Sequence, residues 1–125
     1  MAVRFEVDYA NRLVRTTFAE VVTHWDHSEH TVRLGLDPAF DPSFSELICF
    51  DEKASIRLGF LDFRAESDPF SKDSKRAIVA ARTYPAVYGV ARMFQLVRSE
   101  GANVKIFQTI PEAEAWLGLP CNDKS

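Results

Sequence analysis

Polar and apolar positions at the start of the chain alternate with the period of a β-strand. Residues 2–8 carry this alternation, and residues 12–19 are rich in β-branched side chains, with turn-forming residues between the two segments. The pattern predicts a β-hairpin. A helix is predicted next, because Thr23 suits an N-cap and Asp26 suits an acidic first turn. One side of that helix carries Trp25, Val32 and Leu36, and another carries His27, His30 and Leu34.

Two short apolar runs without polar alternation follow, at residues 47–50 and 77–81. Such runs are typical of strands that are buried on both faces of a sheet. The next segment predicts a long helix that begins at Pro85, where the missing N–H of proline is not needed, and ends before Gly101. Its apolar stripe consists of Val87, Val90, Ala91, Phe94 and Val97.

Residues 104–107 predict a last strand, and residues 111–117 predict a short helix that ends at Gly118. Phe60 and Phe63 lie three residues apart and allow a further short helix. The expected fold is α/β, with a mixed five-stranded sheet, about four helices and the order β-β-α-β-α-β-α-β-α. Residues 1–118 are expected to form this single domain, and residues 119–125 a frayed tail.

The composition is that of an ordinary globular protein, with 46% apolar and 26% charged residues among 125. The net charge of -3 disfavours nucleic-acid binding, which needs a basic surface. No apolar run has the ~18 residues of a membrane span, and the N-terminus does not resemble a targeting peptide. Cys49 lies in an apolar run and Cys121 in the polar tail. We expect them not to pair, which fits a reducing cytoplasm.

Five segments together carry a resemblance to a known family. They are residues 12–18, the repeated Asp-Pro-x-Phe of residues 37–44, and residues 74–80, 88–94 and 112–118. Through them, nearly the whole chain resembles the SpoIIAA-like family of bacterial proteins, which is of STAS/SEC14 type. The resemblance implies a STAS-like fold. By likeness to the lipid-carrying Sec14 fold, it also implies binding of an apolar ligand or association with a membrane.

The resemblance also suggests a phospho-switch as an alternative function. Anti-anti-sigma factors with the STAS fold are switched by phosphorylation of a Ser or Thr in an Asp-Ser-Ser/Thr-Gly motif after the third strand. Here the third predicted strand ends near Asp51, and the next hydroxyl belongs to Ser55, without the flanking Ser/Thr and Gly. The motif is therefore absent, and Ser55 is the candidate phosphosite of the alternative.

Three histidines, His24, His27 and His30, recur at three-residue steps along the first predicted helix. Neutral imidazoles can bind a transition metal such as Zn²⁺. Three-residue steps, however, fan the rings apart over an arc of about 120°. No cysteine or histidine elsewhere in the predicted core completes such a site. We therefore expect a polar helix flank, with no metal and no cofactor.

The apolar arc of the long helix is wider than one face of a sheet requires. Its neighbouring positions extend the arc to about 220°, whereas roughly 100° suffices to pack on a sheet. The excess predicts cover by a neighbouring helix, a ligand, a lipid or a second subunit. Aromatic residues of the first helix and of the 55–66 segment could form a lid beside it, or pack in the core. The predicted ligand or partner surface comprises Trp25, Phe60, Phe63, Gly89, Met93 and Leu96.

Basic residues precede the strand at residues 77–81. Lys72, Lys75 and Arg76 could receive a phosphate or a lipid headgroup, although such a loop is usually only solvated. The sequence contains no recognisable nucleophile–base pair, phosphate-binding loop or metal-ligand spacing. Asp51, at the end of a buried strand, makes no catalytic mechanism alone.

The sequence therefore predicts a non-enzymatic binding or regulatory module. It would use the long helix and the 55–70 segment to engage a partner protein, an apolar small molecule or a membrane lipid. The alternatives are the phospho-switch centred on Ser55 and, in third place, a small enzyme. A homodimer through an exposed apolar patch is a further expectation, and no nucleic acid is expected as a partner.

Overall fold

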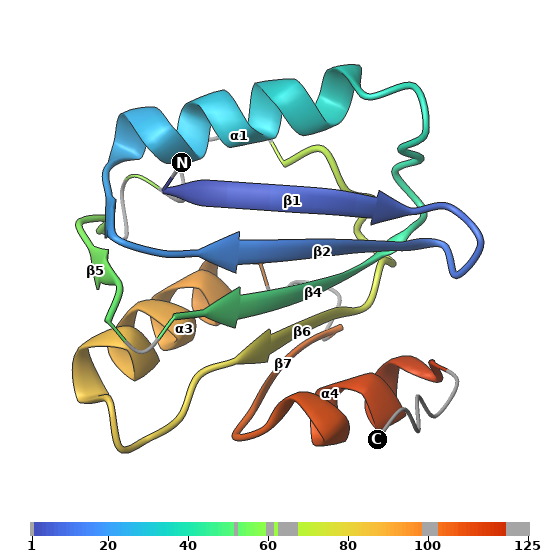
Figure 1. The fold of residues 1–125 in the computed structure, drawn as a ribbon. Coiled ribbons are helices and arrows are strands. Elements are labelled where there is room, and N and C mark those ends of the chain that lie inside the picture. Colours follow the sequence, from blue (N-terminus) through green and yellow to red (C-terminus); the bar gives the residue numbers. More distant parts are fainter. Residues whose placement is uncertain (1, 52, 60–61, 63–67, 99–102, 120–125) are drawn as a thin grey trace.

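A mixed five-stranded sheet with helices on both faces makes up most of the computed structural model, which describes residues 2–51, 53–59, 62, 68–98 and 103–119 (Figure 1). The strands are β1 (Val3–Asp8), β2 (Leu13–Phe18), β4 (Ser45–Phe50), β6 (Arg76–Val79) and β7 (Val104–Phe107). Their order across the sheet is β1-β2-β4-β6-β7. β1 pairs antiparallel with β2, and the other neighbours are parallel. The predicted α/β class and the five-stranded mixed sheet are therefore confirmed.

Each described helix begins or ends at a residue with a physical reason to do so. α1 (His24–Leu36) starts at Thr23, whose side chain accepts from the backbone N–H of Asp26 while the Asp26 carboxylate accepts from the backbone N–H of Thr23. α3 starts at its proline (Pro85–Arg98). α4 (Ile110–Leu117) ends at Gly118, which has φ 75°, a conformation that costs glycine little.

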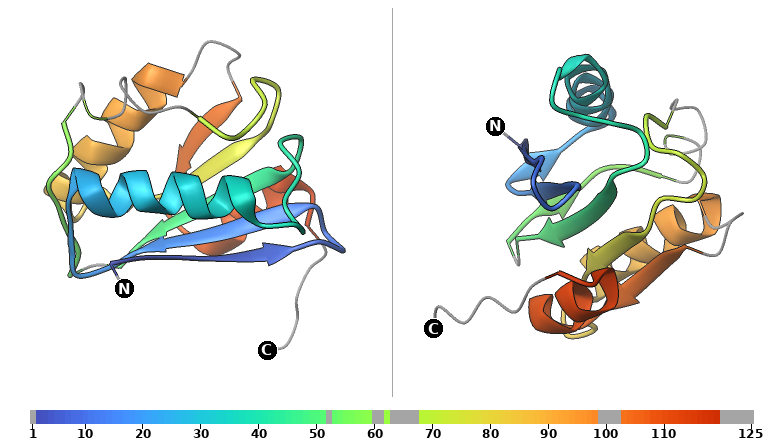
Figure 2. Two further views of the ribbon diagram at one scale, coloured as in Figure 1. Left: turned by 90° about the horizontal axis from the view of Figure 1, so that it is seen from above. Right: turned by 90° about the vertical axis from the view of Figure 1, so that its right-hand side faces the viewer.

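The helices cover opposite faces of the sheet, as the two views of Figure 2 show. α1 and α3 lie on one face and α4 lies on the other. Side chains alternate accordingly along β2, because Leu13 packs in the cluster with Ala113 of α4 whereas Val14 packs in the cluster with Leu34 of α1. Phe18 joins a third cluster, which contains the buried residues of α3. The core therefore has two layers, one on each face of the sheet.

The segment after β4 contains a short strand that was not predicted, and the helix expected there falls on residues that the structure does not describe. Ser55–Ile56 form a short strand, β5, which pairs with β3 (Val21–Val22) in a separate two-stranded sheet. Two-residue strands carry no periodic pattern, which is why they were not predicted. The described residues contain three helices rather than about four. The helix expected at Phe60 and Phe63 lies outside the described residues. Gly101, before which the long helix was expected to end, also lies outside them.

No helix in the described part of the chain combines the length and the apolar character that crossing a bilayer requires.

Candidate functional site

Helix α1 has two chemically different faces, one buried and one exposed. The helix lies beside β1 and runs in the same direction (Figure 1). His27, His30 and Leu34 are its buried residues. The predicted polar flank is therefore wrong for two of the three histidines, and only His24 is exposed.

The buried imidazoles pack among aromatic rings. The His30 ring contacts the Phe5 ring edge-on at a centroid distance of 5.4 Å, and the His27 ring lies 6.1 Å from the Phe18 ring. The two histidine rings are 6.3 Å apart. The rings fill space beside Phe5 and Phe18, and the Nδ1 atom of His30 is buried without a hydrogen-bond partner in the described part of the chain.

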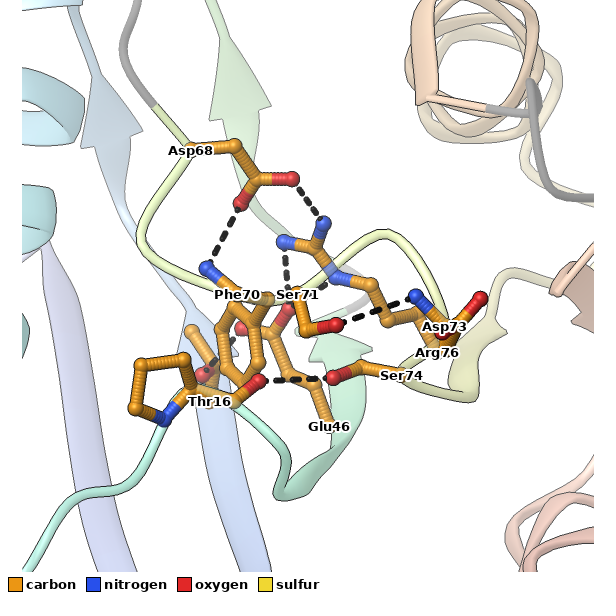
Figure 3. Close-up of polar contacts among 9 residues, drawn as sticks. Thr16, Glu46, Asp68, Phe70, Ser71, Asp73, Ser74 and Arg76 are labelled. Carbon is orange, nitrogen blue, oxygen red and sulfur yellow. Dashed lines mark hydrogen bonds and ion pairs between the residues drawn. The ribbon is translucent and has the colours of Figure 1, made fainter.

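His27 and His30 share a small cavity with a buried ionic network. Figure 3 shows this network. Arg76, at the start of β6, pairs with Glu46 of β4 at 3.0 Å and also with Asp68. Thr16 of β2 donates from its hydroxyl to the second Glu46 oxygen at 2.8 Å. The guanidinium also lies over the rings of Phe70, at 4.4 Å, and Phe94. Every charge of the network therefore has a close partner of opposite sign.

The network corrects the expectation of a solvated basic loop at Lys72, Lys75 and Arg76. Arg76 is buried and is held by two carboxylates, so it is not available to an external phosphate. Ser74 is also buried and donates from its hydroxyl to the Pro42 carbonyl at 2.8 Å (Figure 3). Lys75 is exposed and lies over the Trp116 ring.

The cavity that the histidines share with this network is small, about 20 Å³. It has room for no more than about one water molecule and therefore does not hold a ligand. Burial, and next the positive charge of Arg76, lower the pKa of His30 from 6.5 to about 4. His30 is therefore neutral at physiological pH. The carboxylates of Glu46 and Asp68 both pair with Arg76.

The opposite face of α1 is apolar and exposed. Trp25, Val32 and Leu36 leave 73%, 60% and 77% of their surface open to solvent. They follow one another at intervals of seven and four residues, so they form a single stripe along the helix. A helix on a sheet normally buries its apolar side. Here the two histidines occupy part of the buried side, and three large apolar side chains point away from the sheet.

The rest of the predicted ligand or partner surface is not brought together with Trp25. Gly89 and Leu96 of α3 are exposed, and Met93 is half-buried against the core cluster of the same helix. Phe60 and Phe63 lie outside the described residues. Ser55 is exposed, but it lies in strand β5 and not at a helix N-terminus, where a phosphate would be stabilised by backbone N–H groups.

Charged side chains line two of the hollows on the described surface. One, of about 370 Å³, lies between β1 and α1 and is lined in part by Arg4, Glu29 and Arg33. The other, of about 330 Å³, is lined in part by Asp51 and Lys53, with Arg4 at its border too. Neither is lined by the residues of the predicted surface. Their lining suits ionic contacts better than an apolar ligand.

Metal and thiol chemistry find little support among the described residues. No group of three histidine, cysteine, aspartate or glutamate side chains among them is arranged to hold a metal ion. Cys49 is half-buried, and burial raises the pKa of its thiol, which makes the nucleophilic thiolate scarcer. Cys121 lies outside the described residues.

The Glu46–Arg76 pair was not predicted from the sequence. One signal was present, since Glu46 directly precedes the apolar run of residues 47–50 and so falls within the same strand. A charged residue inside a strand that is buried on both faces needs a partner of opposite charge. Which residue supplies that partner depends on β4 lying beside β6, where Glu46 is directly opposite Arg76.

Comparison of the chain with protein-family models, with curated proteins and with solved structures yields no match in any of the three.

Proposed function

We propose that this chain is a non-enzymatic binding or regulatory module of SpoIIAA-like type that docks a helix of a partner protein along the outward stripe of α1. The observation that carries the proposal is the exposure of Trp25, Val32 and Leu36 on one helix face. Burying a large apolar side chain contributes about 1.5–3 kcal/mol. Covering all three would therefore supply a substantial part of the free energy of a specific complex.

The spacing along the stripe favours a helix as the partner. Trp25, Glu29, Val32 and Leu36 follow at intervals of four, three and four residues, which is the spacing of a coiled-coil seam. Such a seam accepts the side chains of a second helix between its own. Glu29 is the one charged member, and a basic residue of the partner opposite it would be favoured.

The charges beside the stripe disfavour a membrane as the main partner. Helices that lie on anionic bilayers carry clusters of Lys and Arg on their polar face. α1 has Asp26 in its first turn, Glu29 near its middle and Arg33 in its last turn, and Glu29 and Arg33 already pair at 3.4 Å. A partner protein therefore fits this helix better than a lipid surface.

The buried side of α1 supports the same function by holding the helix in place. His27, His30 and Leu34 pack tightly over the sheet, and the capping box fixes the first turn. A docking surface on a fixed helix loses less conformational entropy on binding than a mobile one.

The first experiment places a photo-crosslinking amino acid at Val32 in cells of the source organism, and at Lys105 on the distant strand β7 as the control. A discrete protein crosslinked from Val32 and not from Lys105 would then be purified and titrated against this chain. In a Trp116→Phe background, the fluorescence of Trp25 should shift to shorter wavelength as the partner covers it.

Substitution separates specific docking from general stickiness. Leu36→Asp should weaken the purified complex by at least about 30-fold, the effect of a central interface residue. Ile110→Asp, which changes an exposed apolar residue on α4, should not weaken it. Equal losses for the two variants would contradict the proposal. A membrane-binding result would also contradict it. In that result, the chain binds vesicles that contain half phosphatidylglycerol, Leu36→Asp abolishes this binding, and no protein crosslinks from Val32.

A further inference from the structure

The outer edge of β1 is open to pairing. In the part of the chain that the structure describes, β1 pairs only with β2 and forms one edge of the sheet. Figure 2 shows β1 at the rim, with α1 above it and no described ribbon beyond it. An open edge strand offers unpaired N–H and C=O groups to another strand.

The hydrogen bonds to β2 determine which residues offer those groups. The N–H of Ala19 donates to the carbonyl of Ala2 at 2.8 Å. Because hydrogen-bonded pairs alternate along an antiparallel pair, the backbone N–H and C=O groups of residues 2, 4, 6 and 8 point toward β2. Phe18, opposite Val3, instead accepts from Asp51 with its carbonyl. The backbone groups of Val3, Phe5 and Val7 therefore point away from the sheet, into the space beyond β1.

A second copy of β1 can meet these groups with favourable side-chain pairing. In an antiparallel pair related by a two-fold axis at Phe5, Val3 of one copy lies opposite Val7 of the other, and Phe5 lies opposite Phe5. The exposed side chains on the other face of the strand then pair Arg4 with Glu6 of the second copy, twice over. Opposite charges directly across two strands stabilise a sheet.

The alternative registers pair like charges. A two-fold axis at Arg4 sets Arg4 against Arg4. An axis at Glu6 sets Glu6 against Glu6 and Arg4 against Asp8, but it leaves Val3 without a partner in the second strand. Like charges directly opposite one another are destabilising. The register centred on Phe5 also pairs the backbone groups of all three residues that point away from the sheet, which are Val3, Phe5 and Val7.

We propose that this chain forms a homodimer through antiparallel pairing of β1 with β1 of a second copy, centred on Phe5, which joins the two sheets into one. The backbone groups that form this pair belong to β1 and not to Trp25, Val32 or Leu36, so the dimer does not depend on the proposed partner, although Glu29 borders both surfaces.

The hollow between β1 and α1 supports the same arrangement. It has a volume of about 370 Å³ and is bordered by Asp26, Glu29 and Arg33 on the flank of α1. The axis at Phe5 passes close to His30, because their rings are in contact. The two copies of α1 then run antiparallel across the axis, which brings Arg33 of each copy toward Asp26 and Glu29 of the other. The charged flank of α1 is therefore self-complementary.

Cysteine crosslinking tests the register directly. Arg4 and Glu6 of opposite copies form a non-hydrogen-bonded pair, with Cα atoms about 4.5 Å apart, within disulfide range. In a C49A/C121A background, R4C protein is mixed with E6C protein under mild oxidation, and the products are resolved by mass. The mixed R4C–E6C dimer should form fastest. Faster R4C–R4C or E6C–E6C dimers would overturn the register, and the absence of any dimer would overturn the proposal.

Charge exchange gives an independent test without cysteine. Sedimentation equilibrium should find a dimer of the unaltered chain. R4E and E6R should each raise its dissociation constant about tenfold, since each creates two like-charge pairs. The R4E/E6R double variant should restore the original value, because it exchanges the partners of each pair. R57E, an equal charge change at an exposed residue after β5, is the control and should have no effect. A monomeric parent chain, or a double variant weaker than both single variants, would refute the dimer.

Discussion

Acidification should destabilise this protein through His30, whose imidazole is buried beneath α1. Folding lowers the pKa of His30 from 6.5 to about 4, so between these values the unfolded chain binds a proton that the folded chain does not. Because folding lowers the pKa of the His30 imidazole, its full contribution to stability is present at pH values above 6.5, the pKa in the unfolded chain. That contribution is lost as the pH falls toward about 4, and the dependence on this group levels off below.

The size of the effect follows from the pKa difference. One pKa unit corresponds to about 1.36 kcal/mol, so two and a half units limit the contribution of His30 to about 3 kcal/mol. Between about pH 7 and about pH 4.5, the linkage relation gives a loss of about 2–3 kcal/mol. With the urea dependence usual for a domain of this size, the unfolding midpoint moves down by about 1 M or more.

The groups around His30 account for the direction of the shift. Burial among Phe5 and neighbouring rings disfavours the charged imidazolium, and the positive Arg76 disfavours it further. Glu46 and Asp68 also face the cavity, but each already pairs with Arg76. His27 lies beside His30 on α1, and Arg4, Asp26, Glu29 and Arg33 line a hollow that His30 also borders.

The assay is urea unfolding of the parent chain and of His30→Gln at a series of pH values, with His24→Gln as the control. His24 carries the same ring, exposed on the same helix. Carboxylates lose stabilising contacts in acid in all three proteins. The contribution of His30 is therefore the difference between the proteins in how steeply the unfolding free energy falls with pH. His30→Gln should lose about 2–3 kcal/mol less than the parent chain over this range, and His24→Gln should follow the parent. Equal slopes for His30→Gln and the parent, or an imidazole of His30 that titrates near 6.5 by NMR, would refute the reasoning.

Three further predictions concern stability and are measured by urea unfolding at neutral pH. Arg76→Met should destabilise the fold by about 3–5 kcal/mol, because it leaves two buried or half-buried carboxylates without their cation, whereas Lys75→Met at the exposed neighbouring position should cost less than about 1 kcal/mol. Thr23→Ala should cost about 1 kcal/mol by removing the cap of α1, and Thr23→Ser should retain most of that stability. Gly118→Ala should cost about 1 kcal/mol, since φ is 75° at that position, and no loss there would show that α4 ends differently.

Much of the fold could be predicted from local sequence patterns. The hairpin, the buried strands and three helices follow from periodicity and end signals, and Thr23, Pro85 and Gly118 lie where those signals place them. These signals act over only a few residues, so they are readable without a tertiary structure. The short strands β3 and β5 were beyond reach, because their partners are far apart in the chain.

The candidate site depended on tertiary structure. The sequence placed the histidines and the apolar residues of α1 on different sides of one helix, but it did not determine which side faces the sheet. Hydrophobicity alone would bury Trp25, Val32 and Leu36. The sheet decides otherwise, because it brings Glu46 opposite Arg76, thirty residues apart in the chain, and creates a buried polar surface beneath α1. Neutral histidine can face such a surface without leaving a buried charge unpaired, whereas the apolar residues are left on the exposed side of the helix.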